Sequence, residues 1–388
     1  MELIQKNFIK NPDITNRVNL SSPPTRFGEK YRDALNKSLN IRVFENMNIT
    51  EISENDSRSH VTNITVKSFL GNKGIVGAKL FVLALGGIEN ARILLNSNKK
   101  HQAGLGNEFD VVGRYFMDHP LFEGIVLYPY QKNKLYPYGG LSLNGQNFSH
   151  SIELSREALE KNKIFNARAS LTEASNYYLS EGISTYQYLK WAYENDIDIK
   201  NLTKHLASMF SDWEMILEAM LRKTTNGSVF QHADEFGGFL LDCMFEFPPE
   251  KNNRITLNQD VDALGLRRVN INFRYPKDYM EKNILTLRHI SLAIASSGVG
   301  RVRNVFEMED WKRVLGELTG YGDHHMGTTR MGNDRRKSVV DKNLKIHGKE
   351  NIFVLGSSVF PTGGHVPPTT TIVALAIRAA DHFRGKML

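Results

Sequence analysis

The sequence predicts a mixed α/β fold in which one domain is split by an inserted second domain, and three observations lead to this prediction. The apolar run GAKLFVLALGG is typical of a strand covered on both faces, and it passes into a helical pattern. Near the end of the chain, NIFVLG is a second such run, followed by a Gly/Ser/Pro loop and a final helix. The middle of the chain, about 120–320, combines strand patterns with a mostly helical stretch over 155–223. We therefore expect an incomplete α/β domain at the two ends of the chain, and an inserted domain built from a sheet with packed helices.

The other elements follow from local patterns. Residues 1–30 give no regular pattern before a helical signal that runs from Phe27 to Leu39. Two alternating segments predict strands, and one further segment predicts a hairpin. These segments are NIRVFENMNITEIS, SHVTNITVKSF and NNRITLNQDVDALG.

The start of the last helix has a chemical signature of its own. Pro367 and Pro368 fix the backbone before it, and Thr369 or Thr370 is expected to cap it. A helix N-terminus has unpaired N–H groups and a partial positive charge. The end of the preceding loop is therefore a place where an anion is stabilised.

Composition excludes several classes of protein. The 388 residues are 41% hydrophobic and 23% charged, which argues against a disordered chain, and no apolar run is long enough to span a membrane. The net charge of +7 is a mild bias with no basic stripe, so we expect no nucleic-acid partner. The single cysteine, Cys243, excludes an internal disulfide and favours a reducing, cytoplasmic compartment.

Six motifs are distributed along the chain with characteristic spacing. They are SPPTRFGEKYRDAL, FVLALGGIENARILLNS, VGRYFMDHP, HHMGTTRMG, VVDKNLKIHGKENIFVLGSSVFPT and PPTTTIVALAIRAADH. Together these motifs resemble the glucose–methanol–choline (GMC) family of FAD-dependent oxidoreductases. The resemblance covers nearly the whole chain and is weakest in the middle.

The resemblance implies an FAD-dependent enzyme that oxidises a CH–OH group of a small alcohol, sugar, polyol or glycoside. The family's catalytic histidine lies four residues before the Thr of an HxxGT motif, a position that His324 occupies here. It would take the hydroxyl proton while a hydride passes to the flavin, and imidazole titrates in the useful range. The electron acceptor is not specified by these residues. The neighbouring His325 is interpreted as structural.

The resemblance also implies where FAD binds and how the domains divide. The FAD-binding domain is expected at 1–118 and 322–388, and the substrate domain at 119–321. The FAD contacts are mostly with main chain and the first turn of the last helix. They are expected at Ile49, Gly86, Gly87, Gly356, Ser357, Pro368, Thr369 and Thr370.

Two features depart from the family pattern. Many members have an Asn or a second His just before the Pro-Thr of the last helix, where this chain has Pro367, which has no side-chain donor or base. His365 could substitute only if the loop takes a different path. The second departure is larger, because no GxGxxG turn follows an early buried strand. We expect either an upstream segment or a separate chain to supply that unit.

Two alternatives to an active flavoenzyme stay open at this stage. The chain could be a non-catalytic or truncated remnant of the family that does not bind FAD by itself, as Pro367 and the missing phosphate turn suggest. A metal site built from His324, His325, His347 and His365 is the other alternative, but no pair has helical ligand spacing, so no metal is expected.

Overall fold

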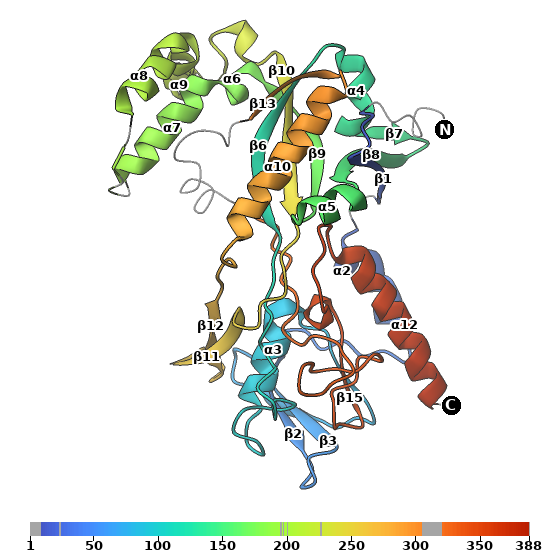
Figure 1. Ribbon diagram of the computed structural model, residues 1–388. Helices are drawn as coiled ribbons and strands as arrows, with labels where there is room; N and C mark the ends of the chain where they lie inside the picture. Colours follow the sequence, from blue (N-terminus) through green and yellow to red (C-terminus); the bar gives the residue numbers. More distant parts are fainter. Residues whose placement is uncertain are drawn as a thin grey trace. The chain divides into compact units, whose positions relative to one another are not determined.

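The computed structural model describes residues 9–22, 25–194, 196, 198–199, 201–225, 227–304 and 320–387. Over these residues the fold is mixed α/β, as the sequence predicts, and the chain divides into two units (Figure 1). Unit 1 comprises Met1–Pro23, Phe122–Cys243 and Glu281–Thr319. Unit 2 comprises Pro24–Leu121, Met244–Met280 and Gly320–Leu388. Pro23 and Pro24 of the SPPTRF motif lie outside the described residues.

Unit 1 is built on a sheet with the strand order β1-β8-β9-β10-β6-β13, to which β7 adds at β8, and helices pack against it. Its strands are β1 (Ile14–Ser21), β6 (Pro120–Pro129), β7 (Leu141–Leu143), β8 (Gln146–Leu154), β9 (Ala167–Ser175), β10 (Phe236–Phe245) and β13 (Gly300–Asn304). Its helices are α4 (Lys132–Gly139), α5 (Arg156–Asn162), α6 (Asn176–Leu179), α7 (Glu181–Glu194), α8 (Leu202–Ser211), α9 (Trp213–Thr225), η1 (Gln231–Ala233) and α10 (Tyr279–Ser296), the last of which runs along the sheet in Figure 1.

Two strands of unit 1 lie in stretches that the sequence analysis expected to be irregular or mostly helical. The stretch 1–30 contains β1, which pairs antiparallel with β8. Its period-two pattern is weak, because Asn16 interrupts it. The second strand, β9, lies in the stretch predicted as mostly helical. Its buried face consists of Ala167, Ala169 and Leu171, and alanine favours helices so strongly that the alternation is easily missed.

Unit 2 contains three small sheets and several helices, two of which, α3 (Gly86–Asn96) and η3 (Ser357–Val359), begin at the glycine turns. The antiparallel strands are β2 (Asn48–Glu54), β3 (Val61–Lys67) and β4 (Lys73–Val76), and the hairpin is β11 (Arg254–Val261) with β12 (Arg267–Asn272). The parallel pair is β5 (Phe81–Leu83) with β15 (Ile352–Val354). The short strand β14 (Gly320–Tyr321) pairs with Pro120 and Leu121, which belong to unit 2. The other helices are α2 (Phe27–Lys37) and α12 (Thr369–Met387). No helix of the described residues is both long and apolar enough to cross a membrane.

The two units divide the chain differently from the sequence-based domains in two places. The first residues group with unit 1, because β1 is hydrogen-bonded to β8. Residues 244–280 group with unit 2, because the β11–β12 hairpin is attached to α3. There Arg92 donates to the Asp262 carboxylate at 2.7 Å. The assignment of FAD and substrate binding to separate domains stays a prediction.

A buried ion pair connects the C-terminal part of unit 2 to β2. The side chain of Lys349 is 3% exposed, and its Nζ lies 2.8 Å from Oε1 of Glu54, whose side chain is 4% exposed. Lys349 also donates to the carbonyl oxygen of Arg58 at 2.7 Å. Removing one partner of such a pair leaves the other charge buried and uncompensated.

We therefore expect Lys349→Met to lower the free energy of unfolding by about 3–5 kcal/mol. Lys342→Met, on an exposed side chain seven positions earlier, should change it by less than about 0.5 kcal/mol. Urea denaturation followed by circular dichroism measures both. Equal losses in the two variants would contradict a structural role for the pair.

Candidate active site

The predicted glycine turns lie together at one edge of the parallel strands of unit 2. β5 and β15 pair in parallel from Phe81 with Ile352 to Leu83 with Val354, so both strands end at the same edge. Gly86 and Gly356 follow these ends with φ of +86° and +103°, and a Cβ at either position would meet nothing within 4 Å. In open parallel sheets, ligands bind at the carboxyl ends of the strands. This edge is therefore the place where a ligand can approach the main chain.

Asn90, which the sequence analysis did not single out, joins the two turns. Its Oδ1 accepts from the N–H of Leu85 at 3.0 Å, and its Nδ2 donates to the carbonyl of Leu355 and to Oγ of Ser358 at 3.0 and 2.9 Å. The side chain is fully buried on α3. The sequence feature that could have identified Asn90 is its position as a polar residue on the otherwise apolar face of α3.

The HHMGTT segment packs directly onto both turns. Ser357 Oγ donates to the carbonyl of His325 at 2.6 Å, and Thr328 Oγ1 donates to the carbonyl of Gly87 at 2.5 Å. A Cβ on Gly87 would lie 2.2 Å from the His325 oxygen. The structure thus gives Gly87 a packing role, and its contact with FAD stays a prediction.

His324 lies against a second histidine, His119, which comes from the VGRYFMDHP motif. The two Nδ1 atoms are 3.0 Å apart, and Nε2 of His119 lies 3.3 Å from the carbonyl oxygen of Gly363. His119 is fully buried, whereas His324 is partly exposed. Burial, reinforced by the nearby His324, lowers the pKa of His119 to about 4. His119 is accordingly a neutral imidazole near pH 7.

A single carboxylate oxygen holds the main chains of both histidines. Oδ1 of Asp118 accepts from the N–H of His119 at 2.7 Å and from the N–H of His324 at 2.8 Å. Asp118 is 4% exposed, and burial raises the pKa of its carboxyl, while the two N–H groups oppose that shift. Asp118 and His119 both belong to the VGRYFMDHP motif, whose sequence alone indicated no role for either residue.

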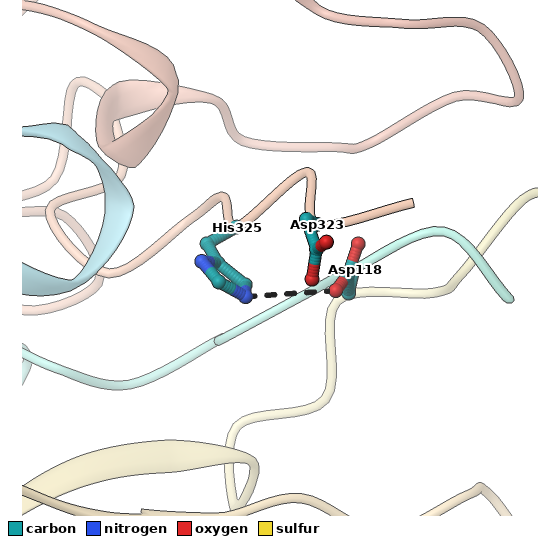
Figure 2. A group of neighbouring side chains, drawn as sticks. All are labelled: Asp118, Asp323 and His325. Atoms are coloured by element: carbon teal, nitrogen blue, oxygen red, sulfur yellow. Dashed lines mark ion pairs between the residues drawn. The ribbon is translucent and has the colours of Figure 1, made fainter. Parts of the chain in front are cut away.

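Figure 2 shows His325 beside the other oxygen of Asp118. Its Nε2 lies 3.7 Å from Oδ2 of Asp118, and its ring centroid is 5.5 Å from that of Phe116. With Asp323, these side chains form a group whose potential ligand atoms all lie within 4.8 Å of one another. Because Oδ1 of Asp118 already binds two N–H groups, we interpret the group as an anchor for the HHMGTT segment and assign no metal to it.

The histidines of the four-histidine metal alternative are not grouped together in the described part of the chain. The one metal-compatible group there contains only His325 of the four. His347 instead places Nε2 against Oγ of Ser338 and the carbonyl of Gly332. His365 is close enough to His119 to lower its pKa electrostatically.

The remaining predicted FAD contacts lie in unit 2. Ile49 is partly buried on β2 and pairs with Val66.

At the start of α12, the carbonyl of Pro368 accepts from the N–H of Ile372 at 3.0 Å. The helix therefore starts one residue earlier than expected, with buried Pro368 at the N-cap position, while Thr369 and Thr370 are exposed in the first turn. Pro367, also exposed, presents no polar side-chain atom.

Residues 249–376 match the family model described as GMC oxidoreductase. The chain is 28% identical over 350 residues to the fructose dehydrogenase large subunit of Gluconobacter japonicus, covering 89% of this chain and 54% of that protein. It is 28% identical over 327 residues to 2-methyl-1,2-propanediol dehydrogenase of Mycolicibacterium austroafricanum, covering 80% and 49%. The chain thus spans about half the length of these curated relatives.

Solved structures show the same fold. Pyridoxine 4-oxidase from Mesorbium loti aligns with a TM-score of 0.55 and 14% identity, over 95% of this chain and 64% of that chain. Formate oxidase aligns with a TM-score of 0.53 and 14% identity, over 90% and 62%. At 14% identity, both alignments show a shared mixed α/β fold. The match to the GMC oxidoreductases thus covers residues 249–376, the C-terminal part of the chain.

Proposed function

We propose that this chain forms part of an FAD-dependent enzyme that oxidises a CH–OH group, with a sugar, polyol or glycoside as substrate. The observation that carries the proposal is the partly exposed His324, held by Asp118 and His119 on the segment that packs onto the glycine turns. The names of the relatives support the substrate class, since they include a fructose dehydrogenase, a propanediol dehydrogenase and a C-glycoside 3-oxidase.

The open glycine turns fit a bound dinucleotide such as FAD. Gly86 and Gly356 leave the space beside their α-carbons open, as close approach to a ligand requires. The residues proposed to hold FAD are Ile49, Gly86, Gly87, Gly356, Ser357, Pro368, Thr369 and Thr370. The N-terminus of α12 would favour negative charge on the bound group. When bound, FAD would supply the hydride acceptor.

In this proposal His324 accepts the proton of the substrate hydroxyl. Its main chain is fixed by Asp118, and its ring by His119, so the base needs little reorganisation before the reaction. Pro367 cannot hydrogen-bond the substrate oxygen through its side chain. His324 is therefore the residue proposed to take the substrate proton. Under the non-catalytic alternative, no substrate reduces a flavin bound at this site.

The test is an anaerobic titration of the FAD-loaded protein with fructose, other sugars, polyols and simple alcohols. We expect loss of the oxidised-flavin absorbance with at least one hydroxyl compound and no change with its deoxy analogue. Adding oxygen, a quinone or cytochrome c to the reduced protein then identifies the electron acceptor. A flavin-loaded protein that no member of the panel reduces would favour the non-catalytic alternative.

A further inference from the structure

The hydrogen bonds around His119 determine where its proton lies. A backbone carbonyl can only accept a hydrogen bond, so Nε2 of His119, 3.3 Å from the carbonyl oxygen of Gly363, carries a hydrogen. Gly363 permits this approach, since a Cβ there would lie 3.1 Å from Cε of Met326 and 3.6 Å from that same Nε2. One of the two ring protonation sites is therefore assigned by geometry.

The charge of His119 then decides the role of its other nitrogen. A cationic ring would donate from Nδ1 as well. Hydrogen bonds to the carbonyls of Gly363 and Gly364 favour that cation, but burial and the neighbouring His324 and His365 outweigh them and lower the pKa of His119. The carboxylate of Asp118 is directed at main-chain N–H groups and at His325. A neutral ring with hydrogen on Nε2 has a lone pair on Nδ1.

His324 must then donate to that lone pair. Its Nδ1 lies 3.0 Å from Nδ1 of His119, and two lone pairs do not face each other at this distance. We infer that His119 is a positioning residue that holds His324 in the tautomer with hydrogen on Nδ1, so that Nε2 of His324 is the atom that receives the proton.

This arrangement serves His324 both before and after it has taken a proton. In the neutral and the cationic ring alike, Nδ1 of His324 carries hydrogen and donates to His119. The neutral acceptor therefore selects the tautomer of the base and also stabilises the imidazolium that forms, as the orienting partner of a catalytic histidine does. The relevance to catalysis rests on the proposed function, but the tautomer itself does not.

The ring nitrogens of His324 can be observed directly by ¹⁵N NMR on histidine-labelled protein at neutral pH, without FAD. The chain has 12 histidines, so the His324 signals are assigned by their loss in His324→Ala. We expect a protonated Nδ1 and a lone pair on Nε2 in the wild type. In His119→Phe, which keeps a buried ring but removes the acceptor, we expect a shift toward the Nε2–H tautomer that free histidine favours. The opposite tautomer in the wild type would overturn the inference.

The same variants have a kinetic readout. His119→Phe should lower the rate constant for flavin reduction about 10- to 100-fold, by analogy with the loss of the hydrogen-bonding partner that orients a metal-ligating histidine. His119→Asn, whose side-chain oxygen can take the place of Nδ1, should recover most of that rate. Unchanged flavin reduction in His119→Phe would contradict the positioning role. An Nδ1–H tautomer in a protein whose flavin no substrate reduces would refute the proposed function and leave the tautomer assignment intact.

Discussion

His324→Ala is expected to lower the rate constant for flavin reduction by substrate about 10²- to 10⁴-fold, the usual contribution of a positioned general base. FAD should stay bound, because the glycine turns are held together by Asn90 and by main-chain contacts that the imidazole of His324 does not make. Stopped-flow absorbance under anaerobic conditions separates the two effects, since it reports the bound flavin and its reduction in one experiment.

His347→Ala is the matched control for this prediction. His347 also lies in the C-terminal part of unit 2, but its ring contacts Ser338 and the carbonyl of Gly332. We expect it to leave flavin reduction within a factor of a few of the wild type, and we expect added imidazole to recover part of the rate in His324→Ala alone. Flavin reduction in His324→Ala that is as fast as in His347→Ala would show that another group takes the proton.

The fold was predictable where local sequence patterns suffice. The apolar runs of β5 and β15, the glycine turns after them and the final helix follow from short-range signals, and the structure contains all of them. β1 and β9 were missed because their patterns are weak by themselves and become strands through pairing with β8. Pairing with β8 therefore determines that these two segments are strands.

The candidate site was predictable only in part, for a geometric reason. His324 is identified by a contiguous motif, but its ring partner His119 is 205 positions away in the sequence. The role of Asp118 arises from one oxygen that accepts from two N–H groups just as far apart in sequence. Single-sequence patterns contain no signal for such long-range contacts. The motif VGRYFMDHP showed that these residues were present without showing what they contact.

The parallel sheet of unit 2 bears on how FAD would bind. Among the described residues it has two strands, β5 and β15, whereas parallel sheets are normally larger and covered on both faces. Val82 on β5 is 41% exposed, and Val373 and Ile377 on α12 are 45% and 61% exposed. These apolar side chains are what a further strand and helix would cover. We propose that a strand, a GxGxxG turn and a helix, from an upstream segment or a separate chain, complete this sheet.

On that proposal, the 388-residue chain alone should bind FAD at least about 100-fold more weakly than the same chain supplied with such a unit. Two charge-assisted hydrogen bonds to the pyrophosphate, at about 1.5–3 kcal/mol each, account for a difference of that size. The corresponding segment of the fructose dehydrogenase large subunit, fused upstream or added as a separate chain, is a practical source. Isothermal titration calorimetry with FAD measures the affinities.

The control is the same segment with the second Gly of its GxGxxG turn changed to Val. It should still cover the apolar face of β5 and α12, but it should not restore FAD affinity, since the added side chain blocks the approach of the main chain to the pyrophosphate. Comparing the unchanged segment with the Gly→Val segment distinguishes the effect of completing the sheet from the effect of binding the pyrophosphate. A yellow protein with one FAD per chain, obtained from the 388 residues alone, would show instead that the open turns at Gly86 and Gly356 suffice to hold the cofactor.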